Sequence, residues 1–483
     1  MPVSPQSQNV RRRQAVAATF QVGLLYSAVA LPAQMLREAF TPDVFLLFLS
    51  FWGTFCFFVL WRRIDWGGYR FMTFGPLFLL ASALFKLDSF LYILFYGNQI
   101  DEWPLYASDP LLSVAYGQFI YVVGALVLVG MWLAFRGHER SIEIINGWRF
   151  DLPTLALAYV IGVGAALSIR VFQLNLLYLG AIVSVVYYLG PISILLISLG
   201  SPGRRTWQRC ILLPSVLSLP LIYAALQTGF KEHIIFSMLP ILAGIFIVIR
   251  GSLARILICL VLAGSYVFMT AFVNIQRGAN WEERENLSVG RLLSITADAI
   301  GEDKDLLGHT VRSALMRKHL IEINGWSIDI VEAIGHVEDF APDQAFAIFI
   351  PRILWSEKPL FRPGNDFTEL AFGPELGESS GTAAGFFSAL YLGSGVWGVL
   401  VYSMLLGALY ALSLSVVIRV GSSFAQVLFL FGAVYRSLRL DEAWPVYEFA
   451  GIVSLLLLAI ALGALISFMQ KRTRRVRLNW QHP

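Results

Sequence analysis

Charged residues are scarce in this 483-residue chain, at 14% of the total, whereas soluble domains carry about 25%. Cysteine is scarcer still: Cys56, Cys210 and Cys259 are far apart and odd in number, which favours neither a disulfide framework nor a metal site. The chain also lacks a Walker loop, a GxGxxG motif, an HExxH motif and a CxxC pair. These absences argue against nucleotide-driven transport and nucleotide-dependent chemistry. We expect no metal, no cofactor and no nucleic acid among its ligands.

Hydrophobic residues make up 57% of the sequence and fall in long runs, each able to cross roughly 30 Å of hydrocarbon. The pattern predicts an all-α, polytopic integral membrane protein with about twelve transmembrane helices. Arg11–Arg13 precede the first run, and no small-residue cleavage site follows it, which indicates a retained span. We place the spans near 14–34, 42–61, 71–92, 111–134, 152–169, 173–199, 210–227, 234–249, 255–274, 384–417, 423–438 and 447–469.

Basic residues alternate between the connections. Short connections on one side carry only Arg37, Arg170, Lys231, Arg436 and Arg439. By the positive-inside rule, the other side and both termini face the cytoplasm. The twenty bases of that side are Arg11–Arg13, Arg62, Arg63, Arg70, Arg136, Arg140, Arg149, Arg204, Arg205, Arg209, Arg250, Arg255, Arg419, Lys471, Arg472, Arg474, Arg475 and Arg477.

One polar segment, residues 275–383, is much longer than the other connections and is predicted to lie on the outer side. It divides the chain into spans 1–274, the large extracytoplasmic loop 275–383, and the last three spans with a basic cytoplasmic tail, 384–483. A connection of this length is usually functional. Amphipathic pieces such as HTVRSALMRKHLIEING predict short helices on the membrane face.

A few bases are expected near the outer membrane surface. Arg436 and Arg439 are three residues apart and share a helix face, while Arg170 ends one span and Lys231 lies in a short outer loop. Converging positive groups at headgroup depth suit a pyrophosphate, since arginine offers a two-pronged donor. The alternatives are snorkelling to the interface, or ion pairs of the two arginines with Asp441 and Glu442.

The large loop also holds candidates for acid–base chemistry. A sugar hydroxyl that attacks an activated anomeric carbon needs a base within hydrogen-bond reach. We single out His336 in GHVEDF, which Glu338 and Asp339 could orient, with Asp366 in GNDFTEL as the second candidate. Most acidic residues of this loop are simply solvated, so each assignment competes with that alternative.

The stretch IPRILWSEKP, followed by PGND and then by GTAAGFFSALYLGSGVWG, resembles a motif of bacterial oligosaccharide repeat-unit polymerases, the O-antigen polymerase-like membrane proteins. The resemblance covers about fifty residues, and Ser356 stands where a proline is frequent. The residues that carry it are Ile350, Pro351, Arg352, Trp355, Lys358, Pro359, Gly364, Asn365, Thr382, Tyr391, Gly395 and Gly398.

This resemblance implies an inverting glycosyltransferase that joins repeat units carried on a polyprenyl pyrophosphate, for O-antigen, capsule or exopolysaccharide. It places Arg352, Lys358 and Tyr391 among the substrate-binding residues. We add Arg170, Lys231, Arg436 and Arg439, which are expected near the outer membrane surface. Expected partners are the lipid-linked oligosaccharide, membrane lipid, and a chain-length regulator and flippase of the same pathway. The alternatives are a glycan ligase using the same donor and a lipid-linked oligosaccharide flippase or transporter.

Overall fold

The computed structural model describes residues 5–66, 73–97, 109–146, 152–170, 188–199, 206–227, 231–248, 289–302, 321–340, 363–374, 384–420, 422–440 and 443–480, with short pieces between 186 and 355. Every regular element in these residues is a helix, which confirms the predicted all-α class for this part of the chain. They form two compact units. The first contains Met1–Trp148 and Leu315–Pro483, and the second contains Arg149–Ala314.

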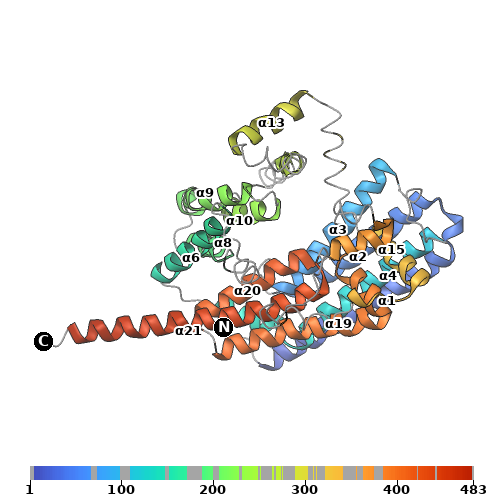
Figure 1. Ribbon diagram of the computed structural model, residues 1–483. Coiled ribbons are helices and arrows are strands. Elements are labelled where there is room, and N and C mark those ends of the chain that lie inside the picture. The colour runs from blue at the N-terminus through green and yellow to red at the C-terminus, as the bar shows by residue number, and fades with distance from the viewer. Residues whose placement is uncertain are drawn as a thin grey trace. The chain divides into compact units, whose positions relative to one another are not determined.

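The first unit is a bundle of long helices whose centre is α4 (Figure 1). Helix α4 packs against α1, α15 and, most extensively, α19. The elements of this unit are α1 (Pro5–Met35), η1 (Arg37–Ala39), α2 (Pro42–Arg63), α3 (Phe74–Tyr96), α4 (Pro110–Ala134), α5 (Gly137–Asn146), α15 (Ile321–Ile334), η4 (Glu338–Phe340), α17 (Pro363–Phe372), α19 (Phe386–Val420), α20 (Ser423–Arg439) and α21 (Pro445–Trp480).

Seven helices of the described residues are long and apolar enough to cross a membrane, so this is a membrane protein. They cover Asn9–Met35, Pro42–Arg63, Phe74–Tyr96, Pro110–Ala134, Gln208–Leu226, Phe386–Val420 and Pro445–Leu465. The spans expected near 152–169, 234–249 and 423–438 are helical but are not among these seven. The spans near 173–199 and 255–274 lie mostly outside the described residues. The count of twelve therefore stays a prediction.

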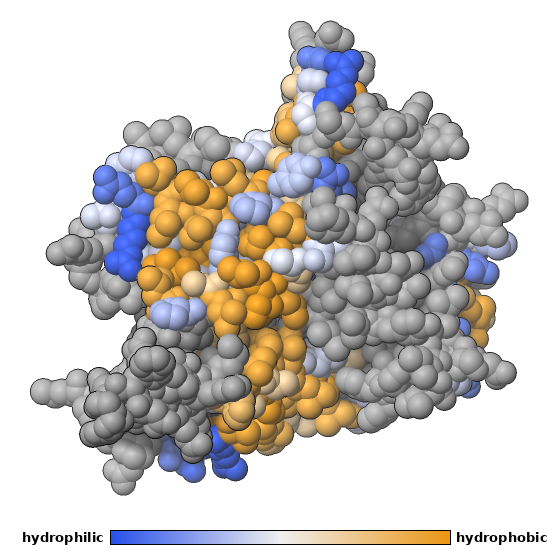
Figure 2. Space-filling model, turned by 60° about the vertical axis from the view of Figure 1, so that its left-hand side comes forward, coloured by the Kyte–Doolittle hydropathy of each residue, from blue (hydrophilic) through white to orange (hydrophobic). Residues whose placement is uncertain are grey.

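Large apolar side chains remain exposed on these helices. Phe20, Trp397 and Leu457 are 69%, 77% and 60% exposed. Figure 2 shows broad hydrophobic areas on the described surface, with hydrophilic residues gathered toward the margins. Apolar patches of this extent are rare on soluble monomers and fit contact with lipid.

Local sequence chemistry sets where several helices begin. Proline occupies the first position of α2 and α4, where its missing N–H is no loss. The Asp109 carboxylate caps α4 by accepting a hydrogen bond from the Leu112 N–H at 3.1 Å. Ser422 caps α20 in the same way, through the Ala425 N–H at 3.4 Å. These caps fix where the two helices begin.

Helix α19 is broken near its start. Gly395 has φ +63° and ψ −160°, which separates a short first segment from the long remainder. A positive φ is accessible to glycine at little cost. The Val337 N–H donates a hydrogen bond of 2.9 Å to the Leu392 carbonyl just before the break. The polar middle segment of the chain is thereby fastened to the kinked helix.

Helix α15 comes from this middle segment but packs deep into the bundle, beside α4 and α19 (Figure 1). A Cβ on Gly117 of α4 would overlap the backbone of Asn324, so this glycine permits the close approach. Two side-chain hydrogen bonds join the same helices, from Ser113 to Asp329 and from Ser388 to Asn324. Most of the amphipathic piece 309–325 lies outside the described residues.

The second unit is built from shorter helices, and its own close contacts also rely on glycine. A Cβ on Gly162 would overlap Gly190, and one on Gly244 would overlap the carbonyl of Cys210. That cysteine lies in a π-helical turn, a local widening of the helix. The elements are α6 (Leu152–Arg170), α8 (Leu189–Leu199), η3 (Gln208–Leu212), α9 (Leu213–Leu226), α10 (Lys231–Val248) and α13 (Val289–Glu302).

Candidate functional site

Arg436 and Arg439 lie in the last turn of α20 and line one cavity of about 280 Å³. The helix buries its apolar face, including Phe429 and Leu430, so the arginine-bearing end is held by packing. The guanidinium carbon of Arg439 lies 5.9 Å from the centroid of the Tyr435 ring, one turn earlier. The predicted sharing of one helix face therefore brings both arginines to one cavity.

Glu448 of α21 pairs with Arg436 inside the bundle. The Arg436 Nη1 to Glu448 Oε1 distance is 2.9 Å, and the two side chains are 22% and 6% exposed. The Tyr410 hydroxyl of α19 donates a hydrogen bond of 3.2 Å to the other carboxylate oxygen. Among the cavity-lining residues, two arginines thus face one carboxylate, which leaves the lining with an excess of positive charge.

Gly451 makes room for this arrangement. A Cβ at that position would overlap the guanidinium group of Arg436. Gly451 lies in α21, three residues after Glu448, and i and i+3 positions share a face of a helix. One turn of α21 therefore provides both the carboxylate that binds Arg436 and the space that its guanidinium occupies.

The start of α19 contributes to the same cavity. Ala384 and Gly385 precede the helix and line the cavity, and Gly385 adopts φ +81°. The Ala389 N–H donates to the Gly385 carbonyl at 3.0 Å. The first N–H groups of a helix have no partner within it and carry a partial positive charge. Helix α19 thus begins at the cavity with its positive end.

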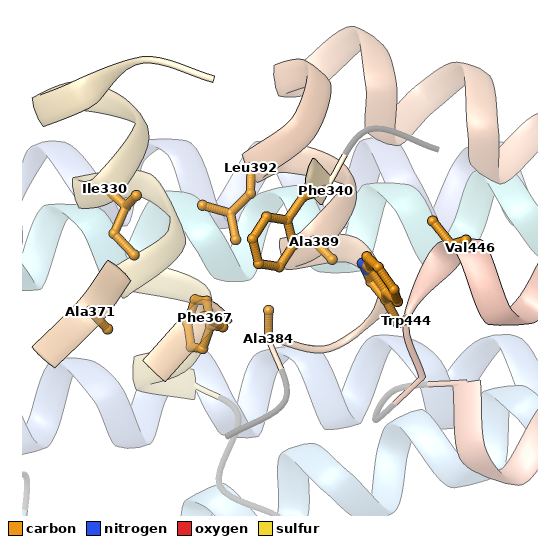
Figure 3. Packing of buried hydrophobic residues seen from close by; sticks show 9 residues of the cluster. All are labelled: Ile330, Phe340, Phe367, Ala371, Ala384, Ala389, Leu392, Trp444 and Val446. Atoms are coloured by element: carbon orange, nitrogen blue, oxygen red, sulfur yellow. The ribbon is translucent and has the colours of Figure 1, made fainter. Parts of the chain in front are cut away.

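An apolar and aromatic wall closes the other side. Figure 3 shows Phe340 of η4 and Trp444 beside Ala384 and Ala389, and all four line the cavity. The rings of Phe340 and Trp444 meet edge to face at 6.2 Å, and Trp444 meets Tyr447 at 5.2 Å. The cluster behind this wall contains Ile330, Phe340, Phe367, Ala371, Ala384, Ala389, Leu392, Trp444 and Val446.

This cluster explains how the long polar segment reaches the site. Ile330 comes from α15, Phe340 from η4 and Phe367 from α17, and all three are at most 1% exposed. Burying a side chain of this size stabilises by about 1.5–3 kcal/mol. The segment between the two sets of spans is therefore anchored by its own apolar residues, and it supplies Phe340 to the cavity.

His336, the first candidate base, is exposed and lies between α15 and η4. Its ring packs against the break in α19, because a Cβ on Gly395 would come within 2.9 Å of His336 Cε1. His336 is not among the residues that line the cavity, although Phe340, four residues later, is. The two residues expected to orient it, Glu338 and Asp339, belong to η4.

Asp366, the second candidate base, lies half-buried in the first turn of α17. It does not line the cavity either, but its carboxylate is within electrostatic range of the Tyr447 phenol, which does. Tyr391 is 9% exposed in the first segment of α19 and meets Tyr116 of α4 edge to face at 6.3 Å. It belongs to a separate contact between α4 and α19.

The described part of the structure does not place the other four predicted binding residues at this cavity. Arg352 and Lys358 lie outside the described residues. Arg170 and Lys231 are the last residue of α6 and the first of α10, in the second unit, and their side chains are outside the described set. Asp441 and Glu442, the expected ion-pair partners of the arginines, are also outside it. The partner that the structure supplies for Arg436 is Glu448.

Glu448, Tyr410 and Gly451 were missed by sequence reasoning. One signal was present: Glu448 is the single charged residue in PVYEFAGIVSLLLLAIALG. An ionisable residue within a span faces the bundle interior and marks a functional or pairing position. Tyr410 and Gly451 gave no comparable signal, since tyrosine and glycine are common in such helices.

Comparison with known proteins gives one match. A family model described as "Domain of unknown function (DUF8712)" matches residues 72–417, which run from just before α3 nearly to the end of α19. The matched region includes Phe340, Ala384 and Gly385 of the cavity and stops before Arg436, Arg439 and Glu448. No curated protein matches the chain. No solved structure matches it.

Proposed function

The chain belongs to the DUF8712 family, and we propose that it is an inverting glycosyltransferase that polymerises polyprenyl-pyrophosphate-linked oligosaccharide repeat units. Its place is the outer face of a bacterial cytoplasmic membrane, with both termini in the cytoplasm. The observation that carries the proposal is the cavity where Arg436 and Arg439 meet the start of α19 and an aromatic wall. It needs no metal or other cofactor.

The charged side of the cavity suits a diphosphate. Arginine donates paired hydrogen bonds to phosphate oxygens, and charge-assisted bonds of this kind are worth about 1.5–3 kcal/mol each. Glu448 orients Arg436 through the 2.9 Å contact between its Oε1 and the Arg436 Nη1. The N-terminus of α19 adds backbone N–H groups, which favour anions.

The aromatic side suits a sugar. Trp444, Phe340 and Tyr447 present ring surfaces to the cavity, and the C–H faces of a pyranose pack well on aromatic rings. The donor would then lie with its pyrophosphate against the arginines and its first sugar against the aromatic wall. An orientation of this kind holds the anomeric carbon at the boundary between the two sides.

The proposed reaction is a single displacement. A hydroxyl of the acceptor sugar attacks the anomeric carbon of the donor, and the new C–O bond forms as the bond to the pyrophosphate oxygen breaks. The electron pair leaves with the polyprenyl pyrophosphate, whose charge the arginines neutralise, and the hydroxyl proton goes to a base. We propose His336 as that base, with Asp366 as the alternative; both are on the polar segment that supplies Phe340 to the cavity.

The arginines give the first test, with purified protein in lipid vesicles and a lipid-linked repeat unit as substrate. Arg436→Ala and Arg439→Ala should each lower polymer formation by roughly tenfold to a hundredfold, and Arg→Lys should restore only part of it. Arg37→Ala is the matched control, because Arg37 pairs with Asp109 away from the cavity. Normal polymerisation by both alanine variants at wild-type protein levels would refute the proposed site.

The base is tested separately. His336→Ala should slow the chemical step by about 10²–10⁴-fold while donor binding persists. Loss of synthesis in Asp366→Asn with normal synthesis in His336→Ala would assign the role to Asp366. Normal synthesis in both would leave charge neutralisation and positioning as the whole catalytic contribution.

Cells lacking the protein separate the related functions. A polymerase defect leaves glycans of one repeat unit, a ligase defect leaves polymer on the lipid carrier, and a flippase defect leaves lipid-linked units inside the cell. Residues 275–383 are proposed to lie outside the membrane, where partners such as a chain-length regulator would meet them. Labelling of a cysteine placed at Glu302 with a membrane-impermeant reagent tests this topology. Labelling only after permeabilisation would reverse the assignment.

A further inference from the structure

A second cavity lies between α1 and α4, away from the arginines of α20. It has a volume of about 400 Å³ and is lined by Thr19, Gly23 and Ser27 of α1 and by Leu126 and Gly130 of α4, among others. A further cavity of about 530 Å³ adjoins it and shares three lining residues with it, Val16, Phe20 and Ala134. Together they form one continuous groove, which we call the α1–α4 groove.

Small residues create this groove. A Cβ on Gly130 would lie 3.6 Å from Thr19 Cγ2, and one on Gly23 would lie 3.5 Å from Leu126 Cδ1. These are ordinary contacts, so a larger side chain at either glycine would extend into the groove without displacing the backbone. The groove therefore exists because these two positions are glycine, and the packing of α1 on α4 would also allow larger residues there.

The polar atoms of the groove are already satisfied. The Thr19 hydroxyl donates to the Ala15 carbonyl at 3.0 Å, and the Ser27 hydroxyl donates to the Gly23 carbonyl at 2.9 Å. Both bonds stay within α1 and leave the groove wall apolar in character. An occupant of this part of the groove must be a hydrocarbon chain, because nothing there recognises a polar group.

One end of the groove is strongly basic. Arg12 and Arg13 line it together with Val16, Ala17, Phe20 and Ala134. Within the described residues, neither arginine has an ion-pair or hydrogen-bond partner, whereas the adjacent Arg11 pairs with Asp65 at 3.0 Å. Two arginines at one end of an apolar groove complement an amphiphile with an anionic head.

The length of the groove fits one leaflet. Val16 and Ser27 are eleven residues apart on α1, which at 1.5 Å per residue is about 17 Å. Half of a bilayer core is about 15 Å thick. We propose that the α1–α4 groove is a binding site for an anionic glycerophospholipid, with one acyl chain along Gly23 and Gly130 and its phosphate on Arg12 and Arg13.

The proposal is tested by lipid retention, measured by native mass spectrometry of the full chain exchanged into detergent with phosphatidylglycerol or phosphatidylcholine as the probe. The wild type should retain phosphatidylglycerol about tenfold to thirtyfold better than phosphatidylcholine, since each of the two arginines should strengthen binding of an anionic headgroup by about threefold to fivefold. Arg12→Gln/Arg13→Gln should abolish this preference, while Arg11→Gln, the matched control, should keep it.

Gly130→Leu tests the contact with the acyl chain separately from the contact with the headgroup. It fills the groove and replaces glycine in a helix interior by a better helix former, so the fold should persist. Its retention of both lipids should fall. Equal retention of the two lipids by the wild type would mean ordinary annular lipid and overturn the proposal, as would unchanged preference in the double arginine variant. Displacement of phosphatidylglycerol by an equimolar polyprenyl phosphate would assign the groove to the carrier lipid and overturn the phospholipid assignment.

Discussion

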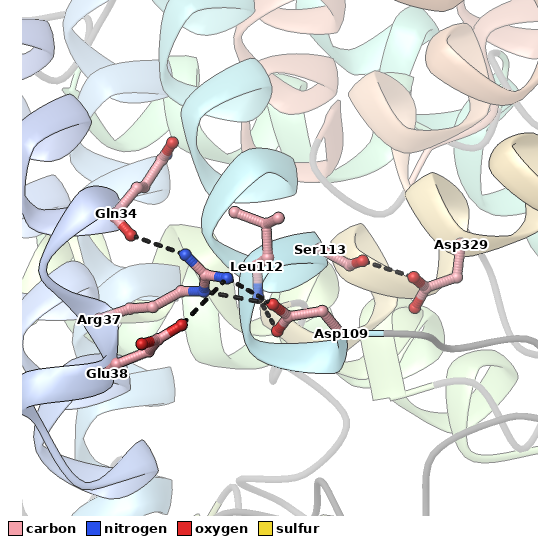
Figure 4. Close-up of polar contacts among 7 residues, drawn as sticks. All are labelled: Gln34, Arg37, Glu38, Asp109, Leu112, Ser113 and Asp329. Carbon is pink, nitrogen blue, oxygen red and sulfur yellow. Dashed lines mark hydrogen bonds and ion pairs between the residues drawn. The ribbon is translucent and has the colours of Figure 1, made fainter.

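Two ion pairs of the first unit join neighbouring helices in different ways. Figure 4 shows the first, in which Arg37 reaches the carboxylate of Asp109 through Nε at 3.2 Å and Nη2 at 2.7 Å. The same aspartate caps α4, and both side chains are partly exposed, at 23% and 38%. This pair fastens η1, which directly follows α1, to the start of α4.

In the second pair, Arg436 with Glu448, the carboxylate is buried and the guanidinium borders the cavity. Glu448 is 6% exposed and also accepts from Tyr410, whereas Arg436 borders the cavity. The two arginines are almost equally exposed, at 23% and 22%, so the pairs differ in their carboxylates, which are 38% and 6% exposed. A partly exposed pair contributes about 0.2–1 kcal/mol, but leaving a buried charge without its partner costs about 3–5 kcal/mol. Under the proposed function, Arg37 serves the fold, whereas Arg436 is held in place for the donor.

The largest expected effect comes from breaking the buried pair on one side only. Arg436→Met should destabilise the protein by about 3–5 kcal/mol, because Glu448 remains buried without its cation. Arg436→Met/Glu448→Met should recover most of that stability, since an apolar pair has no charge to desolvate. Unfolding in detergent measures the free energies. Donor use should stay low in the double variant, and its recovery would show that the pair serves only the fold.

A variant at Gly451 tests the position of the Arg436 guanidinium without changing any charge. Gly451→Ala keeps Arg436 and Glu448 but forces the guanidinium aside, so polymer formation should fall by roughly tenfold to a hundredfold. The guanidinium is the flexible end of its side chain, so the stability loss should be small. Gly164→Ala in α6 is the control, because a Cβ there meets no atom within 4 Å. Equal activity of the two variants would contradict the proposed role of Arg436.

The sequence was sufficient to predict the helical class and to predict that Arg436 and Arg439 share one face of a helix. Hydropathy identifies long apolar helices. Within a helix, two residues that are three positions apart lie on the same face. It was not sufficient for Glu448 as the partner of Arg436, since the nearer acids Asp441 and Glu442 were equally reasonable. That choice depends on how α20 and α21 pack, as does the position of Phe340, which arrives from a segment about a hundred residues earlier.

A buried histidine, His138, extends the comparison. The ring of His138 packs on Trp66 and Trp132 at 5.2 and 6.1 Å, and its Nδ1 has no hydrogen-bond partner. Burial lowers the pKa of His138 to about 4, and the charge of Asp65 only partly opposes this. An unfolded histidine has a pKa near 6.5. Between pH 6.5 and 4 the unfolded state binds more protons, so stability should fall as the pH is lowered, by up to about 1.4 kcal/mol per pH unit.

His138→Phe removes the titrating group and keeps an aromatic ring between the two tryptophans. Its unfolding free energy in detergent should depend less on pH in this window than that of the wild type. Parallel pH profiles for the two proteins would show that His138 is not kept neutral by burial.

The smallest expected effect is that of Arg37→Gln. The variant removes an ion pair that is partly open to solvent, and Asp109 still caps α4 through the Leu112 N–H. The free energy of unfolding should fall by about 0.2–1 kcal/mol, and the loss should shrink further in high salt, because exposed charges are screened. Polymer formation should stay at the wild-type level, since Arg37 does not line the cavity. A loss of polymer formation as large as that of Arg436→Ala would remove the distinction between the two pairs. It would show that η1 and the start of α4 also contribute to the site.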